Sequence, residues 1–157
     1  MEIAYKYGEI KSIIEKYVDE LEDDGYNRYL SWDNCQETFA SPNPSKLHSL
    51  KLAFYLASWG MYRGSSGLLQ KNHLIHQFPV DIFYTNEFNS LKCNSIREIT
   101  KDKIDDVLSL GTKLSDHYKS INFVRGLNTP KPISTTDTLI SKIILGTYTC
   151  IPAFHIL

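Results

Sequence analysis

The segment from Ser58 to Ser66 carries the most distinctive chemistry in the sequence, because its glycines flank an arginine. It reads Ser-Trp-Gly-Met-Tyr-Arg-Gly-Ser-Ser and separates two segments with helical patterns. A glycine-rich turn that leads into a helix presents backbone N–H groups and the positive end of the helix dipole. The Arg63 guanidinium can add two parallel hydrogen bonds to a phosphate or carboxylate. We therefore predict an anion-binding corner at Arg63. The other candidate ligand contacts are Trp59, Ser65, Ser66 and Lys142.

This corner differs from the nucleotide-binding Walker A loop. That loop requires a lysine directly after its last glycine and a strand before its first, whereas here a helical pattern precedes Gly60 and no lysine follows. The alternative interpretation is purely structural. In it, the glycines let two helices pack closely, and Arg63 pairs with an acidic residue of the N-terminal region.

Lys142 lies among the apolar residues Leu139, Ile143 and Ile144 near the end of the sequence. Partial burial among such neighbours would lower the pKa of a lysine or let it reach an anion. The alternative is a side chain that extends to solvent along the helix surface. Asp137 is no partner for Lys142, because a spacing of five residues separates them by about 140° on a helix. Capping of the helix accounts for Asp137.

His73 and His76 have the i, i+3 spacing of a metal pair, but no third or fourth ligand stands at a recognised spacing. We interpret them as surface or half-buried histidines. The three cysteines, Cys35, Cys93 and Cys150, are widely separated, which indicates reduced buried thiols and no zinc site. No metal and no cofactor is predicted. The common motifs of hydrolases, metalloproteases and dinucleotide-binding enzymes are absent from the sequence, so whether the chain is an enzyme stays open.

Length and composition indicate one domain covering residues 1–157. A chain of this size with 42% hydrophobic residues can bury a single core. No apolar stretch is long enough to cross a bilayer, and Glu2 and Glu9 stand where a signal peptide would be basic. We therefore expect a cytoplasmic protein with no membrane partner.

Charge is distributed unevenly along the chain. Residues 1–40 contain ten acidic and four basic side chains, whereas residues 41–157 contain eight acidic and thirteen basic ones. This split is compatible with a weakly basic face, but it is far from the basic excess of dedicated nucleic-acid-binding proteins. The alternative is an acidic N-terminal helix that lies over a basic remainder.

Hydrophobic periodicity predicts an all-α fold, a single-domain orthogonal helical bundle of about six to seven helices. Segment 45–59 is apolar nearly all round and belongs in the centre, while a loop is expected at 86–100 and an extended connector at 126–134. The expected caps are Ser31 or Asp33, Ser65 or Ser66, Thr100, and a capping box from Ser134 to Asp137. The helices are expected at residues 2–23, 32–39, 45–59, 66–72, 75–85, 101–121 and from the Ser134 capping box onward.

Two stretches resemble an uncharacterised family of bacterial all-helical proteins. They are LAFYLASWGMYRGSS at residues 52–66 and DTLISKIILG at 137–146, the latter followed by CIPAF at 150–154. The resemblance brings no activity with it. Members continue past the Pro-Ala-Phe segment with an acidic residue and a further helix. The resemblance therefore implies that this chain, with His155 at that point, is shortened or divergent at its C-terminus.

The second stretch is also similar to part of the helix-hairpin-helix DNA glycosylase superfamily. There, a helix with a lysine and two apolar residues precedes a proline and then an aspartate, where this sequence has His155. The resemblance implies a nucleic-acid-acting protein with Lys142 near the substrate backbone.

Three functions follow from these observations. The first is an accessory helical domain that binds an anionic small molecule or partner at Arg63. The second is a protein that acts on nucleic acid through a glycosylase-like fold. The third is an interaction module, including a homo-oligomer, that uses the apolar C-terminal residues 147–157.

Overall fold

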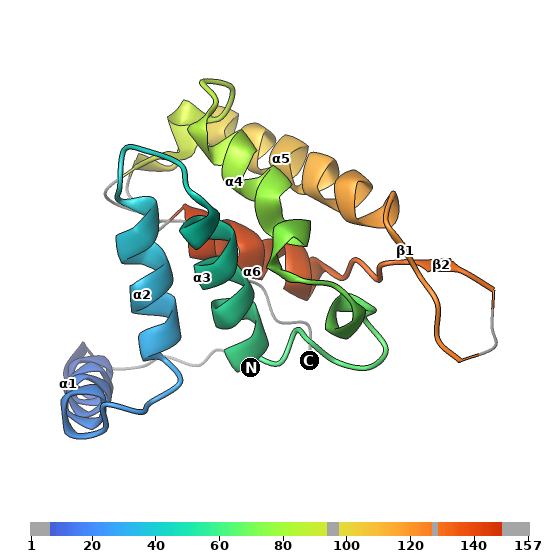
Figure 1. Cartoon of the computed structure of the whole chain (residues 1–157). Helices are drawn as coiled ribbons and strands as arrows, with labels where there is room; N and C mark the ends of the chain where they lie inside the picture. The colour runs from blue at the N-terminus through green and yellow to red at the C-terminus, as the bar shows by residue number, and fades with distance from the viewer. Residues whose placement is uncertain (1–6, 94–97, 127–128, 149–157) are drawn as a thin grey trace, which may run out of the picture.

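The computed structural model describes residues 7–93, 98–126 and 129–148 (Figure 1). This part of the chain contains six α-helices, three short 3₁₀ segments and one two-stranded sheet. The prediction of an all-α, single-domain fold is therefore confirmed. Among the described helices, none is both long enough and apolar enough to cross a bilayer.

The first three helices lie close to their predicted positions. α1 spans Tyr7–Asp23, α2 spans Leu30–Phe39 and α3 spans Lys46–Ser58. Ser45 precedes α3 in extended conformation, and its backbone N–H donates to the Nδ1 atom of His48 over 3.1 Å. This side-chain contact fixes where the central helix begins.

The start of α2 differs from the prediction that Ser31 or Asp33 caps it. The helix follows Tyr29 with no side-chain cap, and Ser31 is buried within its first turn. Backbone bonds from the preceding turn start the helix instead: the Leu30 N–H donates to Asn27 O and the Ser31 N–H to Arg28 O, each over 3.1 Å. Backbone carbonyls of the turn therefore accept hydrogen bonds from the first N–H groups of α2, as a capping side chain would.

Two predicted helices in the middle of the chain are partly 3₁₀ segments. η1 spans Leu68–Gln70, η2 spans His73–His76, and only α4, Gln77–Tyr84, is α-helical. Gly67 before η1 has a φ of +80°, and the Asn72 side chain accepts a hydrogen bond at the start of η2. These two interruptions keep the segments too short for an α-helix.

The last third of the described chain contains the longest helix. η3 spans Asn89–Leu91 and α5 spans Lys101–Lys119, so the loop predicted at 86–100 contains only this short turn in its described part. The expected connector at 126–134 belongs partly to a small antiparallel sheet. It consists of β1, Asn122–Phe123, and β2, Lys131–Pro132.

α6 spans Asp137–Thr147 and begins two residues later than the predicted capping box. Thr136, rather than Ser134, is the capping residue, and its hydroxyl accepts from the Leu139 N–H over 3.1 Å. Asp137 is therefore the first residue of the helix instead of its cap. Its negative charge still lies at the positive end of the helix dipole.

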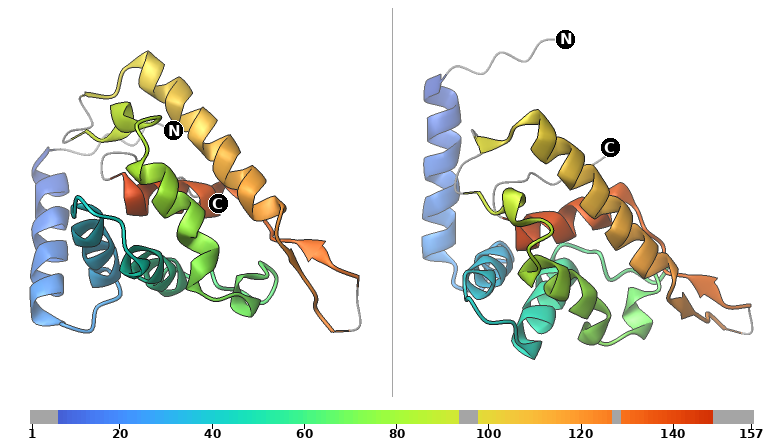
Figure 2. Two further views of the ribbon diagram at one scale, coloured as in Figure 1. Left: turned by 45° about the horizontal axis from the view of Figure 1, so that its top comes forward. Right: turned by 90° about the horizontal axis from the view of Figure 1, so that it is seen from above.

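α3 forms the centre of the molecule, as its apolar sequence predicted. It contacts α2, α4, α6 and η2, and its Leu52, Tyr55 and Leu56 are almost completely buried. α5 runs along the outer side of α4 and α6 (Figures 1 and 2). Cys35 and Cys93 are buried, as predicted, and burial raises the pKa of the Cys35 thiol to about 12. Cys150, like the rest of segment 149–157, lies outside the described residues.

α1 stands beside this body instead of lying over it (Figure 2). No residue of α1 is buried, and its ion pairs, Lys11–Glu15 and Lys16–Glu20, lie within the helix. The expectation of an acidic helix covering a basic remainder is therefore wrong. Periodicity correctly indicated an amphipathic helix but not what covers its apolar face.

Substitution of two glycines by alanine should change the stability of the protein in opposite directions. A Cβ on Gly67 would lie 2.4 Å from the Phe123 ring at a positive φ, whereas a Cβ on Gly111 would meet Ile140 at an ordinary 3.6 Å. We expect Gly67→Ala to lower the free energy of unfolding by about 2 to 4 kcal/mol. Gly111→Ala should raise it by about 0.5 to 1 kcal/mol, because alanine favours the helix. Urea unfolding measures both; an unchanged Gly67→Ala midpoint would contradict this packing.

Candidate functional site

The Arg63 corner is a tight turn that leaves α3. Gly60 has a φ of +73°, and the Met61 N–H donates back to Leu56 O over 2.8 Å. The Arg63 side chain is held at one edge, since its Nε–H donates to Gly60 O over 2.7 Å. Ser66 Oγ donates to Arg63 O over 2.8 Å and fixes the following residues. The turn therefore orients the guanidinium through a hydrogen bond to its own backbone.

Arg63 forms no ion pair with any acidic residue in the described part of the chain. The purely structural interpretation of this corner required such a pair with the N-terminal region, and the described residues do not provide it. The side chain is exposed and lines a cavity of about 280 Å³. Its charge is thus available to an anion from solvent.

Hydroxyl groups dominate this cavity, which we call the Arg63 pocket. None of its lining residues is acidic. The Ser134 N–H donates to Ser66 O over 3.2 Å, which joins the turn to the segment before α6. The first turn of α6 therefore faces the same cavity as Arg63. The hydroxyl-bearing lining residues are Ser65, Ser66, Ser134, Thr136 and Thr138.

Lys142 lies one turn beyond Thr138 on α6 and contacts Trp59 at the end of α3. Its Nζ is 4.6 Å from the indole ring centroid and 3.4 Å from Trp59 O. Partial burial lowers the pKa of Lys142, and the positive charges of Arg28 and Arg63 lower it further. The structure thus brings Lys142 to Trp59, which is 83 residues away in sequence, and within reach of the Arg63 charge.

Arg28 is the site residue that sequence reasoning missed. Its guanidinium carbon lies 5.3 Å from the ring centroids of both Tyr29 and Trp59. Arg28 belongs to the turn before α2, where no motif or periodicity marks it. Only the fold shows that Lys142 and Arg28 share one tryptophan. We call Arg28, Arg63 and Lys142 the cation cluster.

A second cavity adjoins the Arg63 pocket, because Ser65 lines both. It measures about 590 Å³ and lies at the small sheet, where Arg125 and Lys131 contribute two more positive charges. Phe123 forms its apolar wall. The basic surface therefore extends beyond the cation cluster along β1 and β2.

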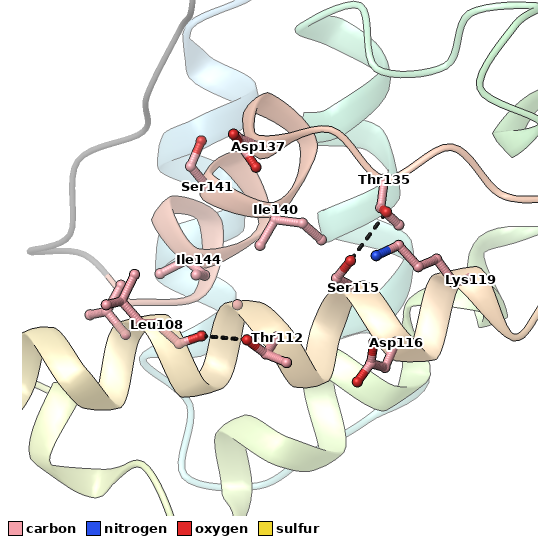
Figure 3. A pocket seen from close by; sticks show the side chains of 12 residues that line it. Leu108, Thr112, Ser115, Asp116, Lys119, Thr135, Asp137, Ile140, Ser141 and Ile144 are labelled. Atoms are coloured by element: carbon pink, nitrogen blue, oxygen red, sulfur yellow. Dashed lines mark hydrogen bonds between the residues drawn. The ribbon is translucent and has the colours of Figure 1, made fainter.

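The structure also contains a groove between α5 and α6 that the sequence did not predict (Figure 3). It measures about 390 Å³, and Ile140 and Ile144 of α6 point toward α5 in its interior. A hydrogen bond of 3.1 Å from Ser115 Oγ to Thr135 Oγ1 joins its two sides. The groove depends on Gly111, whose missing side chain leaves space beside Ile140. Its interior is mainly apolar, unlike that of the Arg63 pocket.

The two histidines do not form a metal pair. His76 is completely buried, which corrects the expectation of a surface or half-buried side chain. Its Nε2 lies 2.7 Å from Tyr62 Oη and its Nδ1 lies 2.6 Å from Tyr118 Oη, so both ring nitrogens are occupied. Within the described ranges, no cluster of three or more potential metal ligands exists.

Burial of His76 makes stability depend on pH. Desolvation, with smaller contributions from His117 and His73, lowers its pKa from 6.5 to about 3. The unfolded chain therefore binds a proton below about pH 6.5 that the folded chain excludes, and stability falls as pH decreases toward 3. From pH 6 to 5 this histidine should remove about 1 kcal/mol of unfolding free energy.

The matched variant is His76→Asn, which retains polar atoms but does not titrate. Its urea midpoint should change less than that of the natural chain between pH 6 and 5, whatever its absolute stability. Equal slopes in the two proteins would show that His76 is not buried in its neutral form.

Comparisons with family models, with curated proteins and with solved structures find no match for this chain. The resemblances to a bacterial helical family and to the DNA glycosylases therefore stay predictions.

Proposed function

We propose that the chain is an accessory helical domain that binds an anionic ligand, or an anionic group of a partner, at the Arg63 corner. The observation that supports this is that Arg28 and Lys142 both contact the Trp59 ring, and that the Arg63 charge acts on Lys142 from a pocket whose lining residues include no acid. Like charges this close repel one another. A bound anion would offset that repulsion.

The chemistry of the Arg63 pocket favours a phosphate or a similar tetrahedral oxyanion. Serine and threonine hydroxyls can donate to several oxygens at once, and a guanidinium can donate to two of them. The first N–H groups of α6 have no partner within the helix and carry partial positive charge. No lining residue of this pocket is a histidine, cysteine or carboxylate that could act as general base, which favours binding over catalysis.

Inorganic pyrophosphate is a suitable probe of this proposal. At ten times its dissociation constant, a ligand adds about 1.4 kcal/mol to stability and should raise the melting temperature by a few degrees. Arg63→Ala and Lys142→Met should each abolish most of this shift while the proteins still unfold cooperatively. Differential scanning fluorimetry measures the shift.

Lys46→Met is the control, because Lys46 is an exposed lysine at the start of α3 and lies outside the cation cluster. It should retain the full pyrophosphate shift. An equal loss in all three variants would indicate nonspecific charge screening and contradict the proposed site. An Arg63→Ala protein that fails to fold would instead support a purely structural corner.

A second candidate function is binding of single-stranded nucleic acid. The second cavity favours it, since Arg125 and Lys131 extend the basic surface beyond Ser65. At the other end, Tyr29 and Trp59 lie with ring centroids 5.2 Å apart and are both partly exposed. Proteins that bind single strands combine a basic path with aromatic rings in this way.

Salt dependence distinguishes this candidate from binding of a small anion. Affinity for a fluorescein-labelled oligothymidine should fall steeply with salt, and Lys131→Met should reduce the slope by about one while sparing the pyrophosphate shift. Fluorescence anisotropy at several salt concentrations measures both. Absence of binding at low salt would eliminate the nucleic-acid function and leave the small-anion proposal intact.

A further inference from the structure

The end of α3 holds two cationic side chains from different parts of the chain. Lys142 Nζ donates to Trp59 O over 3.4 Å, and the Arg63 Nε–H donates to Gly60 O over 2.7 Å. Trp59 and Gly60 are consecutive, so the carbonyls that hold the ammonium and the guanidinium belong to neighbouring peptide units. The half-buried Lys142 amine is therefore fixed next to the Arg63 turn, whose guanidinium lines the Arg63 pocket.

Positive charge at this position exceeds the negative charge that could balance it. In the part of the chain that the structure describes, no ion pair involves Arg28, Arg63 or Lys142. The carbonyl groups at the end of α3 together carry only about half a negative charge. Desolvation, followed by the charges of Arg28 and Arg63, lowers the pKa of Lys142. This environment favours the neutral amine, which is the nucleophilic form of a lysine.

The Arg63 pocket indicates which electrophile would reach this amine. Its guanidinium and hydroxyl groups suit a phosphate. In an acyl phosphate, one oxygen atom joins the phosphate to an electrophilic carbonyl carbon. A phosphate bound in the pocket would therefore hold that carbon close to a neighbouring amine. The phosphate is also the leaving group, and the cation cluster would stabilise the negative charge that it gains as the bond breaks.

We infer that Lys142 is a site of acylation by acyl phosphates whose phosphate group binds in the Arg63 pocket. The inference rests on the proposed anion-binding function and adds the class of ligand. The neutral amine attacks the acyl carbon, a C–N bond forms, and the C–O bond to the phosphate breaks. The departing phosphate takes the electron pair of that bond and the proton that the nitrogen loses. The product is an uncharged amide, so acylation removes one of the three cations and should weaken later anion binding.

Lys92 provides a matched internal control. Its Nζ lies 4.4 Å from the Phe83 ring centroid, much as Lys142 Nζ lies 4.6 Å from that of Trp59. Desolvation also lowers the pKa of Lys92, but no arginine contributes to this shift. The two lysines therefore share an aromatic contact and a lowered pKa, and they differ in the cations beside them.

Incubation of the natural chain with acetyl phosphate, followed by peptide mass spectrometry, measures the rate of acetylation at each lysine. Lys142 should react at least about tenfold faster than Lys92, because the cation cluster stabilises the leaving phosphate. Acetic anhydride lacks a phosphate and should show no preference of that size. Excess pyrophosphate should reduce the ratio of the two rates with acetyl phosphate to the ratio with acetic anhydride, since both anions compete for the pocket.

Arg63→Ala tests the guanidinium itself. This variant should lose the preference of acetyl phosphate for Lys142, while acetic anhydride should still modify that lysine. Lys46→Met is the control variant and should keep the preference, because Lys46 lies at the start of α3. Competition by pyrophosphate in the natural chain tests the same point without a substitution, so the inference does not depend on the folding of Arg63→Ala.

The outcomes separate this inference from the proposed function. A preference for Lys142 that appears with acetyl phosphate alone and is lost with pyrophosphate supports acylation. An equal ratio with both reagents, or a preference that pyrophosphate does not reduce, would overturn the inference. Absence of acetylation at Lys142, together with an intact thermal shift by pyrophosphate, would overturn acylation and leave the anion-binding function standing. Absence of both the acetylation and the thermal shift would contradict both proposals.

Discussion

The close approach of α6 to α3 at Gly146 determines the rest of this structure. A Cβ on Gly146 would lie 2.9 Å from the Tyr55 ring, so only glycine allows this contact. Trp59 lies one turn after Tyr55 at the end of α3, and Lys142 lies one turn before Gly146 on α6. These two side chains are also in contact. The two contacts follow each other in opposite chain directions, which shows that the helices run antiparallel along this seam. The candidate site is therefore an extension of the core packing.

Both ends of α6 are fixed by hydrogen bonds that secure this position. At its C-terminal end, the Gln36 side chain donates to Leu145 O over 2.6 Å, and Cys35 Sγ donates to Gly146 O. At the other end, the link between Ser134 and Ser66 attaches the helix to the Arg63 turn. Packing thereby imposes a cluster of like charges that would separate in a flexible chain. Such an arrangement is costly for stability and useful for binding an anion.

The sequence predicts those features of the fold that depend on residues close together in the chain, and it misses those that depend on distant residues. Local patterns identified the central α3 from its apolar sequence and the six helices within a few residues, while the ligand contacts at the Arg63 turn stay a prediction. They could not identify Arg28, because its place beside Trp59 arises from a tertiary contact. Nor could they show that η2 is too short for an α-helix, that His76 is buried between two tyrosines, or that α1 has an uncovered face. Each of these depends on neighbours that are distant in sequence.

The indole N–H groups of the two tryptophans report directly whether an anion binds at the cation cluster. The Trp59 ring contacts Arg28 and Lys142 of the cation cluster, whereas the Nε1–H of Trp32 donates to Leu145 O near the C-terminal end of α6. Titration of ¹⁵N-labelled protein with pyrophosphate, with resonances assigned through Trp32→Phe, follows both signals in one spectrum. Anion binding at the cation cluster should give a saturable shift of the Trp59 signal with little change for Trp32. A Trp59 signal that stays fixed, or two signals that move together without saturation, would contradict it.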